Sequence, residues 1–288
     1  MQEDSSHEGE QVLILDAVQP FENVRFQGED VRQGGILAEP GAEISPGLIG
    51  LLGAVGLGEI NGGRQPIVGL VATGSELCEA GQALAPGHIY ESNRAMLAPL
   101  VTRAGGLAKV YPLVSDSLEA TRAALETAFR ECDIVVTSGG VSVGEMDFVK
   151  AAFESLGGEL QFWKVAIRPG KPFVFGELGG KFLFGLPGNP VSAFVTFLLL
   201  GRPALRHWQG ARVSTLPAYP GVLGEPISNS SDRRHFMRVR VDNEGKVFSA
   251  GKQASHALGS LALADALLDV PPQTVWAAGT SVKVLRGF

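Results

Sequence analysis

Cysteine is scarce in this sequence, and its two copies form no recognisable pattern. The chain of 288 residues contains Cys78 and Cys132, too few for a disulfide framework or a cysteine-rich metal site. We therefore expect both thiols to be packing residues of a protein that works in a reducing compartment. The cytoplasm is the expected location.

Long hydrophobic runs and an excess of basic residues are absent as well. The first ten residues are polar and acidic, without the apolar segment of a signal peptide. The apolar run 194–200 is too short to cross a bilayer. The formal net charge is −6, whereas nucleic-acid-binding proteins usually carry a basic excess. We expect neither a membrane protein nor a nucleic-acid-binding protein.

The composition is that of a globular, soluble protein, with 45% hydrophobic and 19% charged residues. The length suffices for two domains and a sizeable core. Residues 1–65 are the least self-sufficient part, because they have apolar faces and too little chain to cover them. We expect this region to belong to a larger domain or to a dimer interface.

Strands and helices alternate between residues 66 and 210. Apolar strands are predicted at 67–72, 108–114, 134–136 and 160–166, a hairpin pair at 173–175 and 181–184, and helices at 90–104, 116–130, 148–156 and 190–208. Asp116 and Glu119 have the spacing of a capping box at the start of the second helix. This alternation predicts an α/β fold, a doubly wound and mostly parallel sheet.

From residue 211 the pattern changes to short alternating strands. Met237, Val239 and Val241 alternate with Phe236, Arg238 and Arg240, a turn follows at 242–245, and a return strand at 247–250. The segment 211–288 is therefore predicted to be a small all-β domain.

The stretch 133–150 is the most informative one. A buried strand runs into a glycine-rich turn with hydroxyl residues, and a helix follows; the turn contains Ser138, Gly139, Gly140, Ser142 and Gly144. This geometry presents backbone N–H groups to an anion. Glu145 and Asp147 offer oxygen ligands for a metal on a phosphate. The alternative is an ordinary turn between strand and helix, since neither the P-loop pattern nor the dinucleotide fingerprint is present.

Further polar residues follow the other predicted strands, where ligands bind in open α/β sheets. They are Thr73, Gly74, Glu76, Asp116, Lys164, Arg168, Lys171, Asn189 and Ser192. Carboxylates, hydroxyls and three cations suit a phosphorylated ligand and a divalent metal. Asp116 and Asn189 can equally be helix caps, and Lys164 can be a surface residue.

Two segments carry cations beside constrained backbone or hydroxyls. Arg168 and Lys171 bracket a glycine between Pro169 and Pro172, an arrangement that a merely solvated loop does not need. Arg233 and Ser255 in the last region could bind a small oxyanion, although surface charge on an edge strand is the more common explanation.

Six ordered motifs together resemble one family across essentially the whole chain. They are Thr73-Gly74-Ser75-Glu76-Leu77, Ile89-Tyr90-Glu91-Ser92-Asn93, the segment 137–147 (TSGGVSVGEMD), Phe162-Trp163-Lys164, Arg168-Pro169-Gly170-Lys171-Pro172 and the segment 185–192 (GLPGNPVS). In these motifs the chain is similar to the MoeA family, the molybdopterin molybdenumtransferases, which include the E domain of gephyrin.

The resemblance implies a fold and a reaction. The region 66–210 corresponds to a molybdopterin-binding α/β domain of the MogA/MoaB type, 211–288 to a C-terminal β-barrel, and 1–65 to the remnant of an N-terminal linker and dimerisation domain. The family inserts molybdate into adenylylated molybdopterin and releases AMP in the presence of Mg²⁺. The implied partners are small-molecule substrates, a second copy in a homodimer, and the adenylyltransferase of the same pathway.

The resemblance also implies roles for individual residues. Catalytic roles fall on Asp116, Asp147, Lys164 and Arg168, and Mg²⁺ binding on Glu76, Asp116 and Asp147. Molybdopterin and its nucleotide would contact Thr73, Gly74, Glu76, Ser138, Gly139, Gly140, Ser142, Gly144 and Asn189. The molybdate pocket would consist of Arg168, Lys171, Pro172, Ser192, Arg233 and Ser255.

The chain departs from the family at three points. Ser75 stands where the family usually has Asp, and Arg168 replaces a frequent Lys. The match begins inside the family's N-terminal part, which predicts a chain that lacks the region closing the partner's active site. Two alternatives follow: a MogA-like molybdopterin adenylyltransferase, and a truncated, non-catalytic molybdopterin-binding or scaffold protein. The C-terminal β region and the segment 168–172 favour the insertion enzyme over the adenylyltransferase.

Overall fold

The computed structural model describes residues 2–17, 19–140 and 148–288. Clustering of its contacts separates two compact units, Met1–Ile60 and Asn61–Phe288. Among the described residues, no helix is both long enough and apolar enough to span a bilayer.

The unit Met1–Ile60 has little core of its own. It contains a 3-10 turn η1 (Gln2–Asp4), the antiparallel hairpin of β1 (Ser5–Glu8) and β2 (Gln11–Ile14), and the helix α1 (Pro46–Ala54). Ser45 caps α1 by accepting a hydrogen bond from Leu48 N at 3.2 Å, as the Ser-Pro pair predicts. No residue of α1 is buried: Ile49 is exposed and Leu48, Leu51 and Leu52 are only half-buried, in line with the expectation from the sequence. That a larger domain or a second copy of the chain covers these apolar side chains remains a prediction from the sequence.

The unit Asn61–Phe288 contains a six-stranded sheet in the order β6-β3-β7-β11-β10-β8. The strands are β3 (Ile67–Ala72), β6 (Leu107–Val110), β7 (Ile134–Ser138), β8 (Glu159–Lys164), β10 (Pro172–Leu178) and β11 (Lys181–Leu186). Pairing is parallel from β6 through β11, and β10 is antiparallel to both neighbours. The predicted mostly parallel sheet with a hairpin is confirmed.

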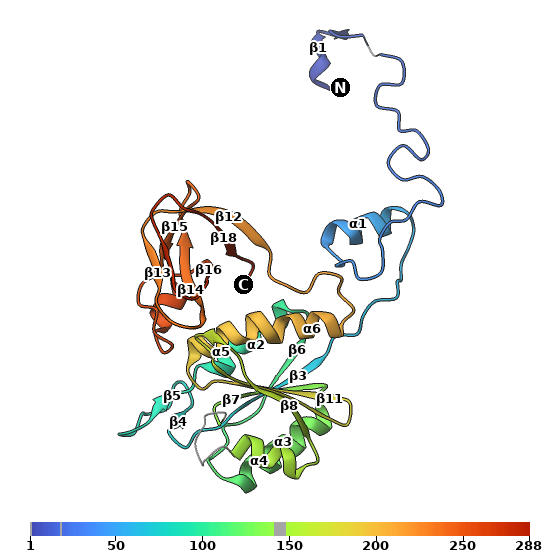
Figure 1. The fold of residues 1–288 in the computed structure, drawn as a ribbon. Coiled ribbons are helices and arrows are strands. Elements are labelled where there is room, and N and C mark those ends of the chain that lie inside the picture. The colour runs from blue at the N-terminus through green and yellow to red at the C-terminus, as the bar shows by residue number, and fades with distance from the viewer. Residues whose placement is uncertain (1, 18, 141–147) are drawn as a thin grey trace. The chain divides into compact units, whose positions relative to one another are not determined.

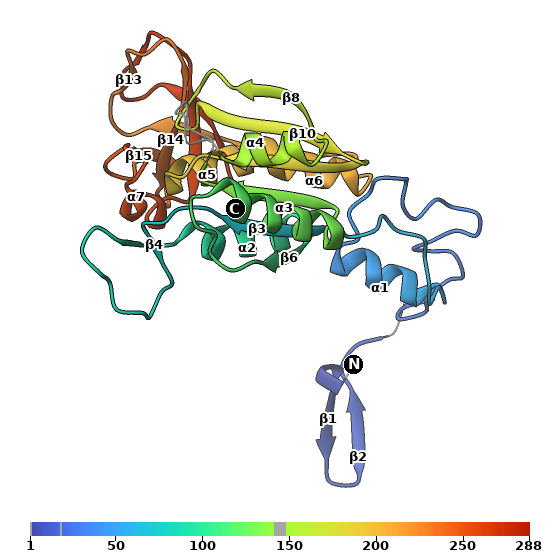
Figure 2. The same cartoon turned by 90° about the horizontal axis from the view of Figure 1, so that it is seen from below.

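Helices cover both faces of this sheet (Figures 1 and 2). One face carries α2 (Asn93–Arg103), α5 (Pro190–Thr196), a π-helical segment η2 (Phe197–Gly201) and α6 (Arg202–Trp208); the other carries α3 (Leu118–Glu131) and α4 (Phe148–Ser155). Successive strand residues point to opposite faces, so Val136 belongs to the first core and Val135 to the second. The fold is therefore a doubly wound α/β domain.

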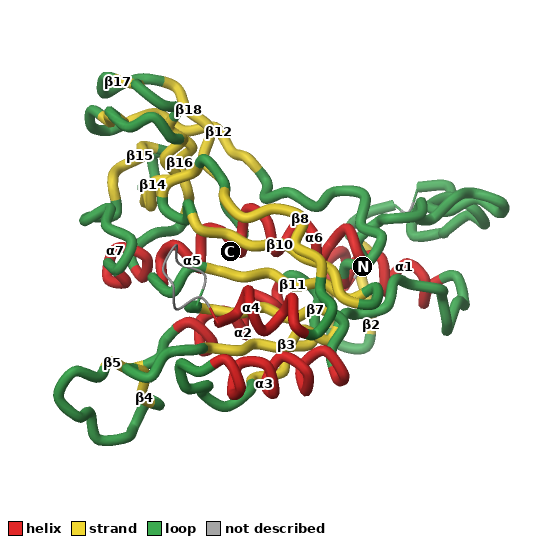
Figure 3. Tube along the Cα trace, turned by 60° about the horizontal axis from the view of Figure 1, so that its bottom comes forward, coloured by secondary structure: helices red, strands yellow, loops and turns green. Residues whose placement is uncertain are grey.

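The C-terminal region forms a closed five-stranded β-barrel, which confirms the prediction of a small β-barrel. Its ring consists of β12 (Ala218–Leu223), β18 (Ser281–Leu285), β16 (Ala266–Val270), β14 (Arg234–Val241) and β15 (Lys246–Ser249), closed by pairing of β15 with both β12 and β14. A short pair, β13 (Ile227–Asn229) and β17 (Thr274–Trp276), and the helix α7 (Leu258–Ala262) complete it. Figure 3 shows α7 close to α5, which it contacts.

A short strand connects the sheet to the barrel. β9 (Ile167–Arg168) follows β8 in sequence but pairs in parallel with β14, with His235 opposite Arg168. The segment that links the sheet strands β8 and β10 therefore contributes a strand, β9, to the sheet of the barrel. This connection places the carboxyl-terminal edge of the sheet beside the barrel.

Two local predictions were wrong. The helix α3 begins at Leu118, and its N-cap is Ser117, whose Oγ accepts from Ala120 N at 3.2 Å. Asp116 does not form the predicted capping box, because its carboxylate accepts the N–H of Ser75. The helix predicted from residue 90 begins at Asn93, because Ile89 and Tyr90 form β5 (Ile89–Tyr90) and pair with β4 (Leu77–Cys78).

Candidate functional site

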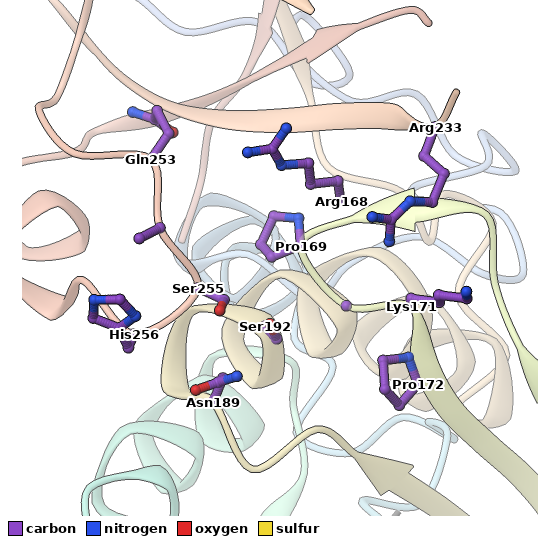
Figure 4. Close-up of a pocket in the computed structure, with 12 residues that line it drawn as sticks. Arg168, Pro169, Lys171, Pro172, Asn189, Ser192, Arg233, Gln253, Ser255 and His256 are labelled. Atoms are coloured by element: carbon purple, nitrogen blue, oxygen red, sulfur yellow. The ribbon is translucent and has the colours of Figure 1, made fainter. Parts of the chain in front are cut away.

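A pocket of about 440 Å³ lies where the sheet edge meets the barrel. Three segments line it: the turn between β9 and β10, the first turn of α5, and barrel residues beside β14 and after β15. The lining residues are Arg168, Pro169, Gly170, Lys171, Pro172, Asn189, Ser192, Arg233, Gln253, Ala254, Ser255 and His256. In Figure 4, Ser192, Ser255 and Asn189 lie together, and Arg233 and Lys171 lie across the pocket from them.

The turn between β9 and β10 packs closely on α5. Gly170 has a φ of +108°, and a Cβ at this position would lie 2.4 Å from Cγ2 of Thr196. Glycine is required here for both the backbone conformation and the close approach. The contact holds the turn that contains Arg168 and Lys171, on either side of Gly170, against α5.

The barrel loop 252–256 is attached to the same helix. Val191 N, in the first turn of α5, donates to Ser255 O at 3.1 Å. Ser192 is buried, with 4% of its surface exposed, and Pro190 occupies the first helical position after the cap residue Asn189. Backbone pairing thus brings two hydroxyl residues, 63 positions apart in the chain, into one pocket.

The pocket is electropositive. Arg168, Lys171 and Arg233 line it, and none of the described lining residues is acidic. The carboxylate of Asp232 lies beside Arg233, with Oδ1 3.7 Å from Nε, but its side chain is 91% exposed and does not line the pocket. Cations beside hydroxyl donors favour a small oxyanion. The six residues that the resemblance assigns to molybdate all line this pocket.

A neutral histidine lies behind the cations. His235 is 4% exposed, and burial, followed by the charges of Arg168, Arg238 and Arg233, lowers the pKa of its imidazole to about 4. At neutral pH this imidazole is therefore uncharged, and it adds no further positive charge beside the three arginines.

A second group of predicted residues lies at the carboxyl ends of β3 and β7. Gly139 has a φ of +88°, and a Cβ there would lie 2.6 Å from Thr73 O, so Gly139 packs directly on the residue that follows β3. Ser75 N donates to Asp116 Oδ2 at 2.8 Å, and Asp116 N donates to Ser75 Oγ at 3.0 Å. These contacts bring Thr73, Gly74, Asp116, Ser138, Gly139 and Gly140 to one edge of the sheet.

Asn93 joins this group to the pocket. It is 7% exposed, and its Nδ2 donates to Ser138 Oγ and to Gly188 O, each at 2.7 Å. Gly188 precedes the pocket residue Asn189. The first turn of α2 therefore links the end of β7 to the beginning of α5.

The predicted magnesium ligands are only partly described. Glu76 and Asp116 are exposed, whereas Ser142, Gly144, Glu145 and Asp147 lie outside the described residues. Within the described parts of the chain, no group of three His, Cys, Asp or Glu side chains could hold a metal ion. Lys164 is exposed at the end of β8, opposite Pro172 in the β8–β10 register, and is not among the pocket-lining residues.

Sequence reasoning missed three residues that organise the site. They are Asn93, which the sequence indicates only as part of a motif near the start of a helix, and Arg238 and Gln253, for which the sequence predicts no role in the site. Gln253 lines the pocket and brackets Arg238, accepting from its N–H and donating to its carbonyl, each at 2.9 Å. The turn after β15 holds no local pattern that would have indicated these contacts.

Comparisons with known proteins agree with this architecture. Residues 69–207 match a family described as probable molybdopterin binding domain, residues 220–286 match the MoeA C-terminal region (domain IV), and residues 1–56 match the MoeA N-terminal region (domains I and II). The chain thus belongs to a class of proteins in which an α/β domain of the molybdopterin-binding type is followed by a MoeA-type C-terminal barrel.

Individual relatives extend the match over most of the chain. It is 39% identical over 280 residues to molybdopterin molybdenumtransferase 2 of Mycobacterium tuberculosis, covering 95% of this chain and 69% of the relative. It is 37% identical over 250 residues to the molybdopterin molybdenumtransferase of Haemophilus influenzae, covering 85% and 62%. A crystal structure of a MoeA protein from Pyrococcus horikosii superposes with a TM-score of 0.80 at 30% identity, covering 99% of this chain and 71% of that one.

The chain belongs to the molybdopterin molybdenumtransferase (MoeA) family. The resemblance inferred from six sequence motifs is confirmed, and the comparisons do not favour the adenylyltransferase alternative. The chain spans 62% of the length of the Haemophilus relative and 69% of the Mycobacterium one.

Proposed function

We propose that this chain is an enzyme of molybdenum cofactor biosynthesis that inserts molybdate into adenylylated molybdopterin and releases AMP. The observation that carries the proposal is the pocket in which Arg168, Lys171 and Arg233 face Ser192 and Ser255, with no acidic residue in the part of its lining that the structure describes. Family membership supplies the reaction, and the pocket supplies a place for its inorganic substrate.

The chemistry of molybdate fits this set of side chains. Molybdate is a tetrahedral dianion, which is stabilised by cations and by hydroxyl or N–H donors. Lys171 and Arg233 offset its charge, and the hydroxyls of Ser192 and Ser255 donate to its oxygens. Arg168 lies at the end of β9 and lines the same pocket. In our proposal it also contacts the phosphate side of the pterin substrate.

The adenylylated molybdopterin is proposed to bind along the carboxyl-terminal edge of the sheet. Gly139 and Gly140 are half-buried at the end of β7 and offer backbone that a nucleotide phosphate can approach. Thr73, Gly74 and Ser138 are buried beside them and would hold this backbone in place. Ser142, Gly144 and Asn189 would extend this surface, and Lys164 would neutralise phosphate charge.

Magnesium belongs to the proposal as well. The exposed carboxylates of Glu76 and Asp116 are oxygen ligands of the kind that Mg²⁺ prefers, and Asp147 would complete the set. A bound Mg²⁺ supplies charge neutralisation at a phosphoanhydride. The chain's own contribution is the orientation of Asp116, whose carboxylate is held by Ser75 N at 2.8 Å.

The partners and location remain proposals of the same kind. A homodimer is supported by the exposed apolar side chains of the unit Met1–Ile60, such as Ile14 and Ile36. Transfer of adenylylated molybdopterin from the adenylyltransferase of the pathway would supply the substrate. The two free cysteines agree with a reducing compartment, for which we propose the cytoplasm.

The test is AMP release from adenylylated molybdopterin by the chain, with Mg²⁺ and increasing molybdate. We expect release to depend on molybdate. Arg233→Ala should raise the half-saturating molybdate concentration about tenfold, because a charged hydrogen-bond donor contributes ~1.5–3 kcal/mol. Arg234→Ala is the matched control, since Arg234 pairs with Asp269 at 2.6 Å and does not line the pocket.

Three outcomes would contradict the proposal. Transfer of AMP from ATP to molybdopterin would indicate the adenylyltransferase. Tight binding of adenylylated molybdopterin without AMP release would indicate a non-catalytic binding protein. AMP release that does not depend on molybdate, and that is the same in Arg233→Ala and Arg234→Ala, would show that the pocket takes no part in the reaction.

A further inference from the structure

Arg238 is the largest side chain that is fully buried in the described structure, with 0% of its surface exposed. It lies in β14, and its guanidinium reaches into the loop that follows β15. Nη2 donates to Lys252 O at 2.8 Å and to Ala254 O at 3.1 Å, and Nε donates to Ser260 Oγ at 3.2 Å. The two carbonyls precede Ser255, so the guanidinium holds the backbone that presents the pocket hydroxyl.

The same loop is fixed at two further points. The amide of Gln253 brackets the backbone of Arg238 with two hydrogen bonds of 2.9 Å, and Ser255 O accepts from Val191 N at 3.1 Å. The loop is therefore clamped between β14 and α5. Loss of the guanidinium would release the β14 side of this clamp while the contact to α5 remains.

The charge of Arg238 has no carboxylate partner among the described residues. Its hydrogen bonds go to two carbonyls and a hydroxyl, and its Nη1 is buried without a hydrogen-bond partner in the described part of the chain. Burial, followed by the charge of Arg168, lowers the pKa of Arg238 to about 10, which leaves it protonated at neutral pH. An unpaired buried charge is costly, and an anion nearby would offset it.

We propose that Arg238 is the positioning residue of the oxyanion pocket: it fixes the loop 252–255 so that Ser255 faces the ligand, and its buried charge is offset when a tetrahedral dianion binds beside Arg168 and Arg233. This inference rests on the proposed function. It means that the affinity of the pocket for molybdate depends on Arg238, a buried residue outside the pocket lining. Arg238 acts through the loop and through the electrostatic field, without touching the ligand.

A purely structural role makes a different prediction. If Arg238 only stabilises the barrel, its replacement lowers the melting temperature and affects both substrates alike. If it positions the oxyanion pocket, the half-saturating concentration of molybdate changes, and that of adenylylated molybdopterin does not. AMP release measured against each substrate in turn separates the two roles.

The variants are Arg238→Met, which removes charge and hydrogen bonds, and Arg238→Lys, which keeps the charge but not the forked donor. Arg240→Gln is the matched control, because it removes a positive charge from the same strand and Arg240 stacks on Phe248 at 5.5 Å. We expect Arg238→Met to raise the half-saturating molybdate concentration at least about tenfold, which corresponds to ~1.4 kcal/mol. Arg238→Lys should lie between Arg238→Met and the wild type, and Arg240→Gln should match the wild type.

A second measurement covers a poorly folded Arg238→Met. Ser260→Ala removes the acceptor of the Nε hydrogen bond and keeps the charge, so it should raise the molybdate requirement by less than Arg238→Met. Molybdate should also raise the melting temperature of the wild type and Arg240→Gln by more than that of Arg238→Lys.

The outcomes separate this inference from the proposed function. A wild type without molybdate-dependent AMP release would refute the proposed function itself. A wild type that is active, with unchanged molybdate dependence in Arg238→Lys and Ser260→Ala, or with both substrates affected equally, would overturn the role of Arg238 alone.

Discussion

Ser75 and Asp116 exchange two hydrogen bonds although 41 positions separate them in the chain. Ser75 N donates to Asp116 Oδ2 at 2.8 Å, and Asp116 N donates to Ser75 Oγ at 3.0 Å. The serine that replaces the family's usual aspartate at this position is thus the hydrogen-bond partner of a predicted magnesium ligand. The pair links the loop after β3 to the loop before α3 and orients the Asp116 carboxylate.

Replacement of Asp116 should distinguish the effect of its hydrogen bonds on stability from the effect of its charge on activity. Asp116→Asn retains an oxygen that can accept from Ser75 N, so we expect the free energy of unfolding to change by less than about 0.5 kcal/mol. AMP release should fall at least about tenfold, since an amide is a weaker ligand for Mg²⁺ than a carboxylate. Ser75→Ala is the complementary variant, which removes one hydrogen bond at a cost of about 1 kcal/mol. Denaturant unfolding and AMP release measure both effects, and an Asp116→Asn protein with wild-type AMP release would refute the metal role.

The clamp formed by Asn93 should matter for stability and for activity. Asn93→Ala removes two hydrogen bonds of 2.7 Å in a buried position, and it leaves Gly188 O without this donor. We expect a loss of about 2–3 kcal/mol in the free energy of unfolding and a reduced rate of AMP release, because α5 is no longer tied to the end of β7. Asn243→Ala, in an exposed turn, is the control and should behave like the wild type in both assays. Equal stability of the two variants would show that the clamp contributes nothing.

Gly139 should not tolerate a side chain. A Cβ there would approach Thr73 O to 2.6 Å at a φ of +88°, so Gly139→Ala combines a strained backbone with a clash against backbone. We expect a cost of about 2–4 kcal/mol. Gly179→Ala isolates the backbone contribution, because Gly179 also has a positive φ but no atom within 4 Å of its added Cβ. It should cost about 1 kcal/mol. Chemical denaturation measures both, and similar losses would mean that the glycine-rich turn relaxes away from Thr73.

The buried His235 should make stability depend on pH between about 6.5 and 4. Its pKa is lowered to about 4 by burial first and then by Arg168, Arg238 and Arg233, so between these pH values the unfolded state binds a proton that the folded state does not. The contribution is fully present above pH 6.5 and is lost as the pH falls toward 4. With ~1.4 kcal/mol per pKa unit, the loss amounts to about 3 kcal/mol.

Urea denaturation across this pH range tests the prediction. His235→Gln should remove most of the decrease between pH 6.5 and 4, whereas His88→Gln, which changes an exposed histidine, should retain it. A wild-type protein whose stability is constant over this interval would show that folding does not lower the pKa of His235, and would contradict the prediction.

Much of the fold could be predicted from local patterns. The β-branched run of β7 and the apolar run of β3 identify buried strands, and Gly157, which has a φ of +85°, comes shortly after the end of α4, where glycine commonly ends a helix. Such signals are readable because hydrophobic periodicity reports which face of an element is buried. They do not report what covers the other face.

Arg238 illustrates the limit. Alternation along β14 places Met237 and Val239 on one face of the strand and Arg238 and Arg240 on the other, and nothing in this pattern distinguishes the two arginines. Arg240 is exposed, whereas Arg238 is completely buried, because the loop after β15 and its contact with α5 cover that part of the face. The alternation of side chains along β14 is therefore correct, but the burial of Arg238 is caused by a segment that is distant in the sequence.

The sequence by itself determined the class of fold, the family and the residue types available for an anionic substrate, because these depend on local periodicity and on short motifs. Only the tertiary structure decided which residues meet. Arg168, Ser192, Arg233 and Ser255 line one pocket because β9 leaves the sheet to pair with β14 and because Val191 binds the loop that contains Ser255. Contacts of this range depend on strand pairing and chain topology, which no short stretch of sequence contains.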